Sequence, residues 1–266
     1  MKKQKAIVLA VVGALAVVAI AGALIRWRTD APRSEKVVRG ESDIPASIDA
    51  AVIPRSVEIY AQALQAAEEK KIPFEDAYIQ GYRAMKDLGE VLNDLSDEKL
   101  AEARKLMKGF VLEPNVESFT IWQDNDQLIA LARKSGTAAD VRYFELEKET
   151  MPNGAWFAFI DQQTDLSGCT RYDGTLTRLY REWTDYTAKF PKSYVPFVKN
   201  ELDSIVDALT QATCICDTKV KALQELVAAE KIVSDETLKK KLQLRVKVIE
   251  GAGPDSGVSF SCQSNG

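Results

Sequence analysis

Apolar residues recur at steps of three and four through the first half of the chain, which places them along one face of a helix. The pattern predicts three helices, over 55–69, 73–93 and 97–108. Ser96 and Gly109 are residue types that begin and end helices, and they flank the third one. Because the connections are short, we expect the three helices to pack as antiparallel neighbours.

Helical spacing returns in four segments of the second half, over 124–134, 174–188, 196–213 and 218–231. The helix at 174–188 is expected to bury Leu176, Leu179, Trp183 and Tyr186. The helix at 218–231 is expected to bury Val220, Leu223 and Val227.

Strand-like segments lie between these helices. Residues 141–147 read as a strand, and residues 155–160 are apolar throughout, as in a central strand buried on both faces. Pro152-Asn153-Gly154 between them predicts a hairpin turn. Residues 242–248 alternate regularly between apolar and polar, and 258–262 are expected to return beside them. The order of elements predicts a helix-rich α+β fold, in which an antiparallel sheet packs with helices and ends in a β-hairpin.

The N-terminal residues 6–25 contain no charged side chain and consist mainly of Ala, Val, Ile and Leu. As a helix they would span about 30 Å, the thickness of the hydrocarbon core of a bilayer. A cleaved signal peptide is the alternative, but its apolar run is usually shorter. We therefore expect four regions: a cytoplasmic tip and transmembrane anchor over 1–28, a polar tether over 29–47, a helical region over 48–136 and an α+β region over 137–266.

The composition excludes several kinds of chemistry. The 266 residues contain no His, so a Ser-His-Asp triad, a Cys-His dyad and a His-bound metal are all excluded. The net charge is −4, but residues 1–28 carry five cationic side chains and no acid, which leaves −9 on the remainder. A domain with this charge repels phosphate backbones, so nucleic acid is not an expected partner.

Four cysteines, Cys169, Cys214, Cys216 and Cys262, all follow the predicted anchor. A bond between Cys214 and Cys216 would close a very small ring, so we expect one of them to pair with Cys169 and the other with Cys262. A redox-active pair and a four-cysteine zinc site are the alternatives, but the chain has no CxxC motif. Two disulfides favour an oxidising compartment. Together with the anchor, they predict a single-pass protein of the bacterial inner membrane, with residues 29–266 in the periplasm.

Other polar clusters match functional patterns only in part. Asp161, Asp165 and Asp173 offer oxygen ligands for Ca²⁺, but the segment lacks the Gly and Glu that an EF-hand loop needs. Ser96-x-x-Lys99 matches a serine-lysine hydrolase motif, but it begins an ordinary amphipathic helix. Small residues spaced four apart in the anchor allow self-association. The sequence therefore assigns no catalytic residue, metal or cofactor.

The best candidate for a partner-binding face consists of Arg171, Arg178, Tyr180 and Arg181, because Arg and Tyr are enriched at interface hot spots. The sequence thus predicts a membrane-anchored, extracytoplasmic protein that binds another protein of the cell envelope. Such a protein would act as an assembly or adaptor factor, or as an inhibitor or immunity protein. The alternative is a cell-envelope glycan hydrolase that uses two carboxylates, since this chemistry needs no His.

Overall fold

The computed structural model describes residues 54–92, 103–105, 107–114, 119–154, 156–162, 168–252 and 257–260. The predicted anchor and tether lie outside these residues, as do most of the predicted helix 97–108, Ser96, Asp165 and Cys262. Within the described ranges, no helix is long and apolar enough to cross a membrane. The anchor at residues 6–25 therefore stays a prediction.

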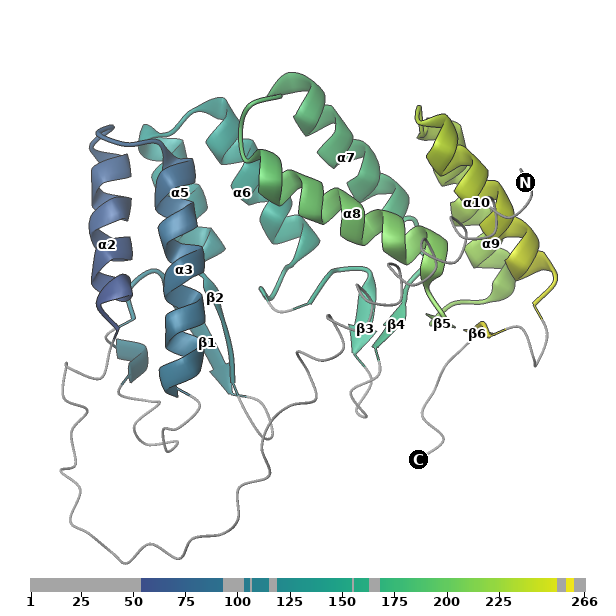
Figure 1. Cartoon of the computed structure of the whole chain (residues 1–266), viewed down its shortest axis with the longest axis horizontal. Coiled ribbons are helices and arrows are strands. Elements are labelled where there is room, and N and C mark those ends of the chain that lie inside the picture. Colours follow the sequence, from purple (N-terminus) through teal and green to yellow (C-terminus); the bar gives the residue numbers. More distant parts are fainter. Residues whose placement is uncertain are drawn as a thin grey trace, which may run out of the picture. The chain divides into compact units, whose positions relative to one another are not determined.

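The described residues form a helix-rich α+β fold, as the sequence predicts (Figure 1). Their helices are α2 (Arg55–Glu68), α3 (Phe74–Leu92), α5 (Asn125–Ser135), α6 (Ala138–Thr150), α7 (Thr175–Lys189), α8 (Val195–Gln211), α9 (Lys219–Ile232) and α10 (Glu236–Glu250). Their strands are β1 (Phe110–Pro114), β2 (Phe119–Gln123), β3 (Ile160–Gln162), β4 (Gly168–Thr170), β5 (Cys214–Ile215) and β6 (Ser259–Phe260). The helices predicted over 55–69, 73–93, 124–134, 174–188, 196–213 and 218–231 are confirmed as α2, α3, α5, α7, α8 and α9.

The strands form two small sheets rather than one antiparallel sheet. β1 and β2 pair antiparallel, with Phe110 opposite Gln123, and this hairpin was not predicted. The second sheet has the order β3-β4-β5-β6 and is mixed. β3 and β4 are antiparallel, whereas β5 runs parallel to both β4 and β6. Parallel pairing needs a crossover of a dozen or more residues, and the helix pairs α7–α8 and α9–α10 provide it.

Residues 141–147, predicted as a strand, belong to helix α6. The helix begins with a capping box, in which the Asp140 N–H donates to the Thr137 hydroxyl at 3.3 Å and the Thr137 N–H donates to the Asp140 carboxylate at 2.7 Å. The predicted hairpin is therefore wrong. Pro152-Asn153-Gly154 do form a turn, with Gly154 at φ +68°, but the turn follows a helix. The predicted central strand at 155–160 is also wrong, because only Ile160 belongs to a strand among its described residues.

Residues 242–248, predicted as the first strand of a terminal hairpin, belong to helix α10. Asp235 caps this helix by accepting a hydrogen bond from the Leu238 N–H at 2.6 Å. The helix buries Leu238, Leu242, Arg245 and Ile249 at steps of three and four. Leu244 is left 61% exposed, so the regular alternation does not mark a buried strand face. β6 does form in the predicted returning segment, but it pairs with β5.

Helix α9 buries a different side from the one that its valines predict. Val220 is 63% exposed and Val227 is 40% exposed. The buried residues are Ala222, Glu225, Leu226 and Ala229. Two alanines on this side let the neighbouring helices approach closely, and the same side carries a glutamate into the interior.

A cluster of aromatic side chains joins α3, α6, α7 and the start of α8. The ring of Tyr143 stacks on that of Tyr194 with centroids 3.9 Å apart, and it meets the edges of Tyr78 and Trp183. The Trp183 indole N–H donates to the Thr150 hydroxyl at 2.9 Å, and both residues are fully buried. Burial of such large side chains strongly stabilises the fold and fixes the position of α7.

Replacing Thr150 with Val removes the acceptor of the buried indole N–H and preserves the shape of the side chain. We expect the free energy of unfolding to fall by about 1–3 kcal/mol, because a buried donor is left unpaired. Urea unfolding followed by tryptophan fluorescence measures this loss. The matched control is Thr184→Val, whose hydroxyl lies on the exposed side of α7, and its loss should stay below about 0.5 kcal/mol. Equal losses in the two variants would contradict the role of the Thr150 hydroxyl.

Candidate functional site

A groove of about 530 Å³ lies between α7 and α9. Each helix contributes lining residues at the spacing i, i+3, i+4 and i+7, so the lining forms one ridge on each helix. The ridge on α7 and its N-cap consists of Gly174, Thr177, Arg178 and Arg181, and the ridge on α9 consists of Lys221, Gln224, Glu225 and Ala228. Tyr172 and Asp173, from the turn before α7, complete the lining.

The first turn of α7 is capped by Glu225 of α9. The N-cap residue Gly174 has a left-handed conformation at φ +96° and carries no side chain to cap the helix. The Gly174 N–H donates to Glu225 Oε2 at 2.7 Å, and the Thr177 N–H donates to Oε1 at 2.9 Å. Burial raises the pKa of Glu225 above its ordinary value, and these hydrogen bonds offset part of the rise. A carboxylate at this position satisfies free N–H groups and interacts favourably with the helix dipole.

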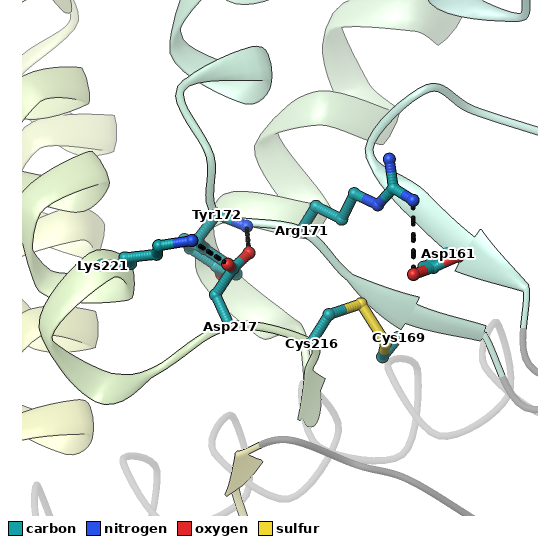
Figure 2. The surroundings of a disulfide bond; sticks show 7 residues. All are labelled: Asp161, Cys169, Arg171, Tyr172, Cys216, Asp217 and Lys221. Atoms are coloured by element: carbon teal, nitrogen blue, oxygen red, sulfur yellow. Dashed lines mark hydrogen bonds and ion pairs between the residues drawn. A yellow bond between two sulfur atoms is a disulfide. The ribbon is translucent and has the colours of Figure 1, made fainter.

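A disulfide and a second carboxylate fix the turn that enters α7 (Figure 2). Cys169 of β4 is bonded to Cys216, which follows β5. The neighbouring Asp217 accepts a hydrogen bond from the Tyr172 N–H at 2.8 Å and forms an ion pair with Lys221 at 2.9 Å. Burial acts to raise the pKa of Asp217, but the bonds from Lys221 and Tyr172 outweigh it and hold the pKa below its usual value. The segment from Cys216 to Lys221 thus attaches the start of α9 to the start of α7.

The structure separates the four residues that the sequence predicts as one partner-binding face. Arg178 and Arg181 line the groove. Arg171 does not, because its guanidinium pairs with Asp161 at 3.3 Å and points away from Tyr172, Asp217 and Lys221 (Figure 2). Tyr180 is half-buried and packs against the hydrophobic core.

Arg178 is held in place by acids from two helices. Its guanidinium pairs with Glu149 of α6 at 2.6 Å and with Glu182 of α7 at 3.3 Å. Arg142 of α6 pairs with the same two acids, at 3.4 and 2.9 Å. This four-residue network lies across α6 and α7. It keeps Arg178 at the groove but already satisfies much of its charge.

Arg181 differs from the other two cations of the groove. Lys221 pairs with Asp217, and Arg178 pairs with two glutamates. In the part of the chain that the structure describes, Arg181 forms no ion pair, and its side chain is exposed. A guanidinium in this state can bind a carboxylate through two parallel hydrogen bonds. Among its described residues, the groove therefore presents one cation without an ion pair, on the α7 ridge.

The acids that line the groove are already engaged by backbone groups. Asp173 accepts a hydrogen bond from the Thr175 N–H at 3.1 Å, and Glu225 caps α7. Among the other predicted calcium ligands, Asp161 pairs with Arg171, and Asp165 lies outside the described residues. The ranges that the structure describes contain no cluster of three or more acidic or cysteine residues arranged to hold a metal ion.

The cysteines are used as structural links wherever the structure describes them. Cys169 and Cys216 are joined, which is one of the two pairings that the sequence left open for Cys169. Cys214 is also disulfide-bonded, and Cys262, the predicted partner of the second bond, lies outside the described residues. A sulfur held in a disulfide is neither a thiolate ligand for zinc nor a free nucleophile.

Sequence reasoning found the two arginines of the groove but missed the residues that build it. Val220 and Val227 predict the opposite side of this helix as the core, and nothing in the sequence marked Glu225 as buried. Its contacts lie 48 and 51 residues away in the chain, so no local pattern marks them. No protein-family model, no curated protein and no solved structure matches the chain.

Replacing Glu225 with Ala should loosen the first turn of α7 and destabilise the fold. The change removes a cap and two hydrogen bonds to a largely buried carboxylate, so we expect a loss of about 2–3 kcal/mol in the free energy of unfolding. Urea unfolding measures the loss. The matched control is Glu230→Ala on the same helix, which removes only an exposed hydrogen bond to Gln243 and should lose less than about 0.5 kcal/mol. If Glu225→Ala is no less stable than this control, the capping role is wrong.

Proposed function

We propose that the chain is a single-pass, membrane-anchored protein of the periplasm that binds another protein of the cell envelope. The α7–α9 groove is the proposed docking site. The observation that carries this proposal is Arg181, an exposed arginine without an ion pair among the described residues, on the rim of a groove whose other charges are engaged. Assembly factors, adaptors, inhibitors and immunity proteins are the types of protein that work by such docking.

The shape and charge of the groove favour a protein segment as its occupant. Two helical ridges, with a volume of about 530 Å³ between them, provide room for several side chains of a partner. Arg is enriched at the hot spots of protein interfaces, where it pairs with carboxylates in a setting shielded from water. We therefore expect the docked segment to carry an Asp or Glu that reaches Arg181.

The proposed location is supported by two observations. Residues 6–25 are long and apolar enough for a transmembrane helix. The bond between Cys169 and Cys216 is of the kind that persists in an oxidising compartment.

The alternative function, a glycan hydrolase with two carboxylates, gains no support from the groove. Such an enzyme needs one protonated acid and one free carboxylate on either side of a sugar. Asp173 and Glu225 are the acids of this groove, and both accept hydrogen bonds from backbone N–H groups of α7 and its N-cap. Protein binding therefore remains the favoured function of the groove.

A photoactivatable cross-linking residue in place of Gln224 tests the docking site in cells of the source organism. We expect one discrete adduct that depends on irradiation, because Gln224 is exposed and lines the groove. Adding Arg181→Glu should reduce this adduct about tenfold or more, since reversing a hot-spot charge costs at least about 1.4 kcal/mol.

Two controls make the cross-linking result specific to the groove. The same cross-linking residue at Lys240, on the exposed surface of α10, should give no such adduct. Lys240→Glu, which makes the same charge change as Arg181→Glu, should leave the Gln224 adduct intact. An adduct of equal yield at both positions, or one that Arg181→Glu does not weaken, would contradict the proposed docking site.

Oxidation of the cysteines in living cells tests the proposed location. After cells are lysed with an alkylating reagent under non-reducing conditions, mass spectrometry should find the peptides of Cys169 and Cys216 linked. A cytoplasmic protein keeps its thiols reduced, so alkylated Cys169 and Cys216 as the main species would contradict a periplasmic domain. The same digest shows whether residues 6–25 remain in the mature chain.

A further inference from the structure

A pair of buried acids lies away from the groove, on α6 and α8. Glu147 is 5% exposed and Glu201 is 8% exposed. We infer that these two carboxyl groups form a proton-binding site, which makes the packing of α8 against α3 and α6 depend on pH. The inference is independent of the proposed function, because it concerns the interior of the fold rather than the docking groove.

The hydrogen bonds between described residues satisfy one of the two carboxyl groups and leave the other without a partner. The Tyr78 hydroxyl donates to Glu147 Oε1 at 3.0 Å, and the Tyr143 hydroxyl lies 3.4 Å from Oε2. Glu201 Oε2 is buried and has no hydrogen-bond partner among the residues that the structure describes. Leaving an ionised carboxylate in this state is strongly unfavourable, whereas a bound proton removes the charge.

Within the described ranges, the groups that interact with the pair supply no positive charge. From α3, Tyr78 and Tyr82 interact with both acids. From α6, Tyr143 does the same. Burial raises the pKa of these three phenols above its ordinary value of about 10, so they stay neutral in the physiological range. The rings that pack on Tyr78 and Tyr143 from α7, from α8 and from the N-cap of α8 are likewise uncharged: Trp183, Tyr186, Phe197 and Tyr194.

The two acids therefore titrate near neutral pH. Burial raises the pKa of Glu147 to about 7. Burial and the charge of Glu147 raise the pKa of Glu201 to about 8. In the unfolded chain the pKa of both groups is about 4.3. Between this pKa and the pKa values of the folded state, the folded chain therefore binds more protons than the unfolded chain. The stabilisation is complete at low pH and is lost as the pH rises through the pKa values of the folded state.

The consequence is that rising pH places two like charges between packed helices. α8 contacts α3 through the rings of Phe197 and Tyr78, whose centroids are 4.9 Å apart. Ionisation of Glu147 and Glu201 at this joint favours states in which α8 moves away and water reaches the carboxylates.

Thermal unfolding of the full-length chain between pH 5 and pH 8 tests the inference. We expect the unfolding equilibrium constant to rise at least about 100-fold over this range. Each tenfold change corresponds to a shift of roughly 3–5 °C in the midpoint, so the midpoint should fall by at least about 6 °C. Glu201→Gln should match the wild type at pH 5, have a higher midpoint at pH 8, and lose more than half of the pH dependence.

Asp203→Asn is the matched control, because Asp203 is an exposed acid on the same helix. It should keep the pH dependence of the wild type. A wild-type midpoint that does not change between pH 5 and pH 8, or an unchanged slope in Glu201→Gln, would overturn the inference. If Glu201→Gln fails to fold, carbon-13 NMR titration of the wild type decides. Two glutamate carboxyls with midpoints above pH ~6 support the site, and midpoints below pH ~5.5 for every glutamate overturn it.

Discussion

The first turn of α7 depends on a carboxylate from another helix. Gly174 begins α7 without a capping side chain, so the free N–H groups of that turn need an acceptor from elsewhere in the fold. Glu225 provides it across 48 to 51 residues of chain. These two hydrogen bonds cap α7 and also link it to α9, so they set the distance between the ridges of the groove. The groove could not keep its shape if α7 and α9 were free to slide.

Other contacts hold the remaining parts of this frame. The Cys169–Cys216 disulfide joins β4 to the segment before α9, and Asp217 binds the turn that enters α7. On its other side, α7 is attached to α6 by the buried bond between Trp183 and Thr150 and by the half-buried network of Arg142 and Arg178 with two glutamates. Ion pairs that solvent still reaches contribute little stability individually. Their role here is to position Arg178, while the cap, the disulfide and the aromatic core fix the helices.

The sequence predicts elements well where one physical signal dominates. The stripe from Leu176 to Tyr186 correctly predicts a helix and its buried side, because large apolar residues at helical spacing have few other uses. The prediction fails where two signals conflict: alternating apolar residues at 242–248 favoured a strand, but the Asp235 cap and the good helix formers that follow it produce α10. Arg178 and Arg181 could be nominated from residue type alone. Glu225 and Asp217 could not, because the backbone N–H groups that they bind lie 45 to 51 residues away in the chain.

We propose that the groove between α7 and α9 is the surface that binds a partner protein. Amide hydrogen exchange of the chain, alone and with the partner identified by cross-linking, tests it most directly. We expect binding to slow exchange in residues 172–181 and 221–228 and to leave the exposed side of α10 unchanged. Protection confined to other surfaces, with no change along these two ridges, would contradict it.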